Sequence, residues 1–243
     1  MHRNGILTPD DPDLAFKLFE VLKLADMLLI DSIKAAIISR IRDDWPATLK
    51  EYRENRRVYR TKDPSDRELK KIDRFTPEPA SVLRVARQFD HTLLTPHLFY
   101  ILSFTDPLTP YDVTELPHNQ VMGLARWDLV SSRDKGIAAA GRARLLHRYT
   151  EQLLDQKKNC SSGIHACSSR WHELAKLVPL ALVEGSDPLS ILYAVLTREN
   201  GSEHRMRFPQ GICENCAQGW DRHISALQAS IFADLSNFYI DLE

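Results

Sequence analysis

Glycine and long apolar runs are scarce in this sequence, and each shortage argues against a class of function. Nine glycines among 243 residues leave no glycine-rich loop of the kind that cradles nucleotide phosphates. No apolar stretch reaches the ~18 residues that a membrane-spanning helix requires. The N-terminus lacks the basic start and apolar run of a signal peptide. We therefore expect an intracellular protein, cytoplasmic or nuclear, that does not engage a membrane.

An excess of either charge is also missing. The chain has 32 Lys and Arg against 33 Asp and Glu, so its formal net charge is -1. A balance of this kind does not favour nucleic acid or an anionic membrane as a partner. The catalytic patterns GxSxG and HExxH are absent as well. We expect a protein that is not an enzyme.

What the sequence does contain is helical periodicity. Hydrophobic residues make up 43% of the chain, enough for a sizeable core, and they recur at helical spacing. Alternating, β-branched runs bounded by hairpin turns are not found. The fold class predicted is all-α, a helical bundle or array. The predicted helices cover, approximately, residues 12–25, 31–41, 44–52, 76–89, 96–102, 117–154 with a break near 131–132, 171–184, 188–196 and 217–238.

The first two predicted helices form a compact hairpin, and their spacing marks one face of each for burial. Asp11-Pro12 is typical of a helix start, and Asp31 is expected to cap the second helix. The faces expected to be buried consist of Leu14, Leu18, Val21, Leu22 and Ala25 in the first helix and Ile33, Ile37 and Ile41 in the second.

The same spacing marks one face of the later helices for burial. These faces consist of Val82, Val85, Ala86 and Phe89; Leu98, Phe99, Ile101 and Leu102; Ile137, Gly141, Leu145, Tyr149 and Leu153; and Trp220, Ile224, Leu227, Ile231 and Phe238.

An ordered set of short segments runs through most of the chain. These segments are LFEVLKLADMLLIDSIKAAIISRI (18–41), DDWPATLKEY (43–52), PASVLRVARQFDHTLLTPHLFYILS (79–103), DPLSILY (187–193) and CENC (213–216). The first resembles the last two helices of a BTB/POZ domain. Together, in this order and spacing, they resemble BTB domain-containing proteins of mushroom-type fungi over roughly residues 14 to 240.

The resemblance implies a domain organisation and a function. Residues 1–43 would be the remnant of the C-terminal helical hairpin of a BTB domain, whose β-sheet core is absent. Residues 44–243 would be a helical, BACK-like region with a cysteine-bearing C-terminal part and a linker at about 53–75. The implied function is non-catalytic protein–protein interaction, as an adaptor or scaffold. Self-association or cullin binding is expected only if an upstream BTB core exists.

The four cysteines are the best candidates for a binding site. Cys213 and Cys216 have the two-residue spacing that lets both sulfurs reach one ion, and Cys160 and Cys167 could complete a tetrahedral site for structural zinc. His165, His172 or His204 could replace one cysteine. Buried thiols without metal, or a disulfide, are the other interpretations.

Two catalytic interpretations of the cysteines are weaker. A redox CxxC motif of the thioredoxin type requires a βαβ setting that this sequence lacks. A cysteine nucleophile would need a histidine base, and Cys160 or Cys167 with His165 is conceivable. Neighbouring Cys and His residues in helical proteins are more often structural.

A basic stretch supports an alternative function. Residues 50–74 hold ten Lys or Arg against six Asp or Glu, and the segment YRENRRVYR (52–60) interleaves tyrosines with arginines. Such a pattern can bind single-stranded nucleic acid through stacking and charge, as in a nucleic-acid-binding regulator. We favour a solvated helix face, in which Glu51 and Glu54 pair locally with the arginines.

Overall fold

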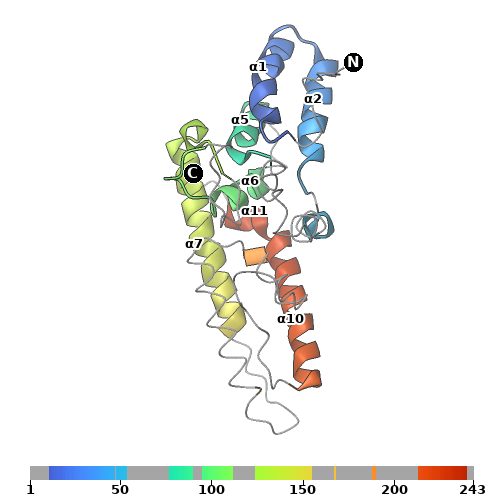
Figure 1. Cartoon of the computed structure of the whole chain (residues 1–243), viewed down its shortest axis with the longest axis vertical. Coiled ribbons are helices and arrows are strands. Elements are labelled where there is room, and N and C mark those ends of the chain that lie inside the picture. Colours follow the sequence, from blue (N-terminus) through green and yellow to red (C-terminus); the bar gives the residue numbers. More distant parts are fainter. Residues whose placement is uncertain are drawn as a thin grey trace, which may run out of the picture. The chain divides into compact units, whose positions relative to one another are not determined.

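The computed structural model describes residues 11–46, 48–53, 77–89, 95–111, 124–154, 167, 188–189 and 213–239 (Figure 1). Every regular element within these residues is a helix, which confirms the predicted all-α class. The chain divides into two compact units, residues 1–138 and 139–243. None of the described helices is long and apolar enough to cross a membrane.

The first unit begins with a hairpin of α1 (Leu14–Met27) and α2 (Asp31–Asp43), which lie side by side (Figure 1). A salt bridge between Lys34 and Asp26 ties α2 to the end of α1. Asp31 is the first residue of α2 rather than its cap, because Ile30 takes the cap position and no side chain caps this end. The residues of the predicted α1 face that are buried are Leu14, Leu18, Leu22 and Ala25.

Two residues that the periodicity assigned to the core lie at the surface instead. Val21 is 44% exposed and Ile33 is 43% exposed, whereas Ile38 is buried together with Ile41. The apolar residues of this hairpin therefore lie on more than the one face of each helix that is buried.

Two further helices described in the first unit are α5 (Pro79–Phe89) and α6 (Thr95–Leu102). The Glu78 carboxylate accepts the backbone N–H groups of Ala80 and Ser81, each at 2.8 Å, and so caps α5. This cap places the start of α5 at Pro79 rather than at the predicted Thr76-Pro77. The predicted buried face of α5 is confirmed in Val82, Val85, Ala86 and Phe89, and that of α6 in Leu98, Phe99 and Leu102.

A partly buried polar network joins the start of α1 to the start of α5. The Arg126 guanidinium donates to Asp13 at 2.9 Å and lies 4.2 and 4.1 Å from the ring centroids of Phe16 and Tyr111. The Arg126 backbone N–H donates to Glu78, and the Tyr111 hydroxyl donates to Asp13 at 2.7 Å. Burial, reinforced by this hydrogen bond to Asp13, raises the pKa of Tyr111.

The helix predicted over residues 117–154 is shorter than expected among the described residues. Residues 124–126 are not helical, and only the 3-10 turn η2 (Trp127–Leu129) precedes α7 (Ser132–Leu154). The predicted break near Ser131 is confirmed, since the Ser131 hydroxyl accepts the backbone N–H of Asp134 and donates to the Asp134 carboxylate. This side-chain cap starts α7 where the sequence places a break.

The second unit contains the rest of α7 together with α10 (Glu214–Ala233) and α11 (Leu235–Phe238). The buried side-chain amide of Gln228 donates a hydrogen bond to the Leu189 carbonyl at 2.9 Å. Gly141 makes room for Tyr239, because a Cβ at residue 141 would lie 2.1 Å from Tyr239 Cδ1. The predicted buried residues confirmed in this unit are Leu145, Tyr149, Leu153, Trp220, Ile224, Leu227, Ile231 and Phe238.

Several predicted features lie outside the described residues. These are the helix at 171–184, most of the helix at 188–196, and nearly all of the linker at about 53–75. The third predicted helix is represented by helical residues 49–53, where Tyr52 is buried. The domain boundary expected at residues 43 and 44 stays a prediction.

Candidate functional site

Two cysteines lie in the first turn of α10. Cys213 is the N-cap residue, with extended backbone angles of φ -68° and ψ 155°, and Cys216 is the third residue of the helix. The sequence placed the helix start near Ala217, so that both cysteines would precede it. The helix in fact begins at Glu214, which puts both sulfurs on one helical turn.

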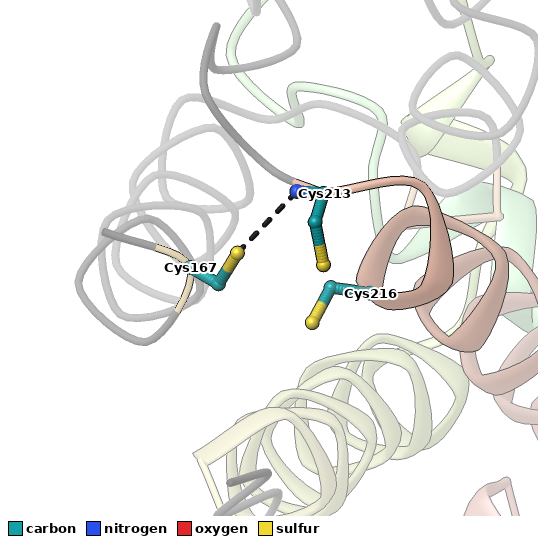
Figure 2. A group of neighbouring side chains, drawn as sticks. All are labelled: Cys167, Cys213 and Cys216. Carbon is teal, nitrogen blue, oxygen red and sulfur yellow. Dashed lines mark hydrogen bonds between the residues drawn. The ribbon is translucent and has the colours of Figure 1, made fainter. Parts of the chain in front are cut away.

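Cys167 lies against this turn. The Sγ atoms of Cys167, Cys213 and Cys216 are all within 4.8 Å of one another, and Figure 2 shows the three sulfurs facing the same space. The Cys213 backbone N–H donates to Cys167 Sγ at 3.3 Å (Figure 2). Cys167 is fully buried, at 0% exposed, while the other two are half-buried. This group is referred to below as the cysteine cluster.

The fourth predicted ligand, Cys160, lies outside the described residues, as do His165, His172 and His204. Of the four cysteines singled out by the sequence, the structure therefore brings three together. Within the part of the chain that it describes, this is the one group of three or more Cys, His, Asp or Glu residues with geometry suited to a metal ion.

The cysteine cluster can hold a metal ion. A tetrahedral ion with metal–sulfur bonds of about 2.3 Å separates its sulfurs by about 3.8 Å. Separations within 4.8 Å reach that value through small side-chain movements. The partial positive charge at the start of α10 and the Cys213 N–H offset part of the negative charge that several thiolates would bring together.

The second notable feature is an apolar surface on the α1–α2 hairpin. Seven large apolar side chains between residues 21 and 33 are at least about one-third exposed, and we call them the apolar tip. They are Val21, Leu24, Met27, Leu28, Leu29, Ile30 and Ile33. The most exposed are Leu29 at 83% and Met27 at 77%. Sequence periodicity missed this surface, although four consecutive apolar residues at 27–30 cannot all face the interior from one helix end.

The turn between α1 and α2 is held in an unusual conformation. Leu29 has a φ of 55°, in the left-handed region that glycine favours. For an L-residue with a side chain this conformation costs roughly 1–2 kcal/mol. Burial of its own side chain does not offset that cost, because Leu29 is almost fully exposed.

Comparisons with known proteins found no relative of this chain. The chain matches no family model, no curated protein and no solved structure. The fold and the two features above define an all-α protein with a thiol cluster capable of binding metal and an exposed apolar tip.

Proposed function

We propose that the chain is a non-catalytic protein-interaction module and that the apolar tip is the surface it offers to a partner. The observation that carries this proposal is the concentration of exposed apolar side chains. Of the nine large apolar residues exposed among the described residues, seven belong to the apolar tip. Contiguous exposed apolar patches on soluble proteins commonly mark interaction sites.

The charges around the apolar tip indicate what kind of partner fits. Lys34 pairs with Asp26, and Lys23 lies 3.5 Å from Glu20, so positive and negative side chains alternate at its margin. A margin of this kind exerts little net attraction on a charged surface. The partner is therefore another protein that presents an apolar face, and its binding depends weakly on salt.

The resemblance to BTB domain-containing proteins supports the same proposal. It implies an adaptor or scaffold whose α1–α2 hairpin corresponds to the last helices of a BTB fold. Self-association or cullin binding would belong to an upstream BTB core and not to the apolar tip. The proposal places the protein in the cytoplasm or nucleus, where thiols stay reduced.

The test compares two exposed leucines. Leu28, 59% exposed, lies in the apolar tip, whereas Leu108, 88% exposed, lies outside it. A photo-cross-linking amino acid at residue 28 captures the partner, and the same amino acid at residue 108 serves as control. The captured protein is then purified and its affinity is measured for wild type, Leu28→Ser and Leu108→Ser.

We expect Leu28→Ser to weaken binding by about tenfold, since burying over half of a leucine contributes about 1–2 kcal/mol. Leu108→Ser should leave the dissociation constant unchanged. Equal capture at residues 28 and 108, or equal affinities of the two variants, would contradict the proposal.

A second candidate function, a structural zinc-binding domain, is favoured by the cysteine cluster. Zinc is the metal proposed, because thiolate ligands at tetrahedral spacing suit zinc, and a closed thiolate site supports folding rather than catalysis. One equivalent of zinc in protein purified without added metal, measured by elemental analysis, supports this candidate. Protein free of zinc that also fails to bind added zinc excludes it.

The nucleic-acid alternative has less support. Only residues 50–53 of the basic stretch at 50–74 lie among the described residues. Binding to single-stranded oligonucleotides at low salt, lost as the salt concentration rises, would favour it. Binding at the apolar tip is expected to depend only weakly on salt, so a single salt series separates the two functions.

A further inference from the structure

We infer that the cysteine cluster is a structural zinc site from which hydrogen peroxide releases the metal. Cys213 and Cys216 are the pair that is oxidised, and Cys167 is a ligand that stays reduced. The inference rests on the second candidate function, structural zinc binding, and adds a regulation of that site. It follows from the different positions that the three sulfurs occupy.

Cys213 and Cys216 are placed to form a disulfide with each other. They occupy the N-cap and third positions of the same helical turn, and their Sγ atoms lie within 4.8 Å. Paired cysteines at this spacing support redox chemistry, and a helix N-terminus favours the thiolate form that reacts with peroxide. Rotation of the two side chains brings the sulfurs together without moving the helix.

Cys167 is placed differently. Its side chain is fully buried, whereas Cys213 and Cys216 are half-buried, so a dissolved oxidant meets the pair first. The Cys167 sulfur also accepts the N–H of Cys213, which fixes it beside the metal position rather than toward solvent. The structure thus separates a reactive pair from a protected ligand.

The chemistry uses hydrogen peroxide as the oxidant. One thiolate of the pair attacks a peroxide oxygen, the O–O bond breaks, and a sulfenic acid forms while the departing hydroxide takes up a proton to become water. The second thiolate attacks the sulfenic sulfur, the S–S bond forms, and a second water leaves after protonation. In total two thiolates, one peroxide and two protons yield one disulfide and two waters. Zinc loses two anionic ligands and is released as Zn²⁺.

The experiment uses the full chain, reduced, stripped of metal by a chelator and reloaded with one equivalent of zinc. Hydrogen peroxide is added, released zinc is followed with a chromogenic chelator, and disulfides are assigned by peptide mass spectrometry. We expect one zinc released for each disulfide formed, and the disulfide between Cys213 and Cys216. Added reductant should cleave this disulfide and restore zinc binding.

Three variants separate the roles of the residues. Cys216→Ser should lose the disulfide, while Cys167→Ser should weaken zinc binding and still form it. Asn215→Ala changes an exposed residue of the same turn and should behave as wild type. Because the disulfide is assigned in wild type, the result does not depend on the variants folding.

The outcomes distinguish the inference from the function on which it rests. If the metal-free protein fails to bind zinc, or shows no thiolate-to-cobalt charge-transfer band when cobalt(II) is added, both the structural zinc function and the inference built on it are wrong. If zinc stays bound through peroxide treatment, the inference of release by peroxide is wrong and the structural zinc function stands. A wild-type disulfide that includes Cys167 or Cys160 also overturns it, because the assignment of the reactive pair would then be wrong.

Discussion

Gly141 offers a sharp test of packing in the second unit. An alanine Cβ at residue 141 would lie 2.1 Å from Tyr239 Cδ1 and 2.3 Å from Cε1, which is far inside van der Waals contact. The Tyr239 ring, now 5% exposed, must move. Overpacking of this kind costs about 1–3 kcal/mol. The gain of about 0.5–1 kcal/mol from replacing a mid-helix glycine offsets part of it. We expect Gly141→Ala to lower the free energy of unfolding by about 1–2 kcal/mol.

Gly136 provides the matched control. It lies in the same helix, but nothing is within 4 Å of the position its Cβ would occupy. Gly136→Ala should therefore raise stability by about 0.5–1 kcal/mol through helix propensity alone. Urea unfolding, followed by circular dichroism, measures both variants, and the double variant Gly141→Ala with Tyr239→Ala measures the coupling between the two positions. Equal stabilities of the Gly136→Ala and Gly141→Ala variants, or no coupling in the cycle, would refute the close approach of Gly141 and Tyr239.

Three further predictions concern the first unit. Arg126→Leu should destabilise it by about 1.5–3 kcal/mol, because the partly buried Asp13 loses a charge-assisted hydrogen bond, and Arg126→Lys should destabilise it by less, as judged by urea unfolding. Burial lowers the pKa of His97, so the unfolded chain binds this proton more readily, and stability should fall as the pH drops below about 6.5. His97→Gln should flatten that dependence in unfolding curves at pH 7.5 and 5.5, and equal slopes would contradict the expected burial. Leu29→Gly should raise the unfolding midpoint by relieving about 1 kcal/mol of backbone strain while weakening partner binding, and a loss of stability would argue against strain.

The sequence predicted the helices well wherever their apolar residues face a single direction. Leu145, Tyr149 and Leu153 in α7 and Trp220, Ile224 in α10 are all buried as expected. Boundaries were harder to place, because they depend on individual side-chain hydrogen bonds. The Glu78 cap moves the start of α5 to Pro79, a choice that periodicity does not encode.

The two candidate sites were predictable to different degrees. The spacing of Cys213 and Cys216 is local, so the sequence alone indicated that they could share a ligand. That Cys167 joins them depends on a contact across 46 residues of chain, which only the fold supplies. The apolar tip was missed because periodicity identifies an apolar residue but not whether another element covers it, as Val21 and Ile33 show.

Both candidate sites contain a residue poorly suited to its local structure. Cys213 occupies a helix N-cap without a side-chain capping bond, where Ser, Thr or Asp would stabilise the helix by about 1 kcal/mol. Leu29 occupies a left-handed turn position where glycine would avoid a strain of similar size. The buried helix faces need no explanation beyond folding, but folding does not explain these two residues. A residue that lowers local stability is expected where it serves binding, and the two lie in the cysteine cluster and the apolar tip.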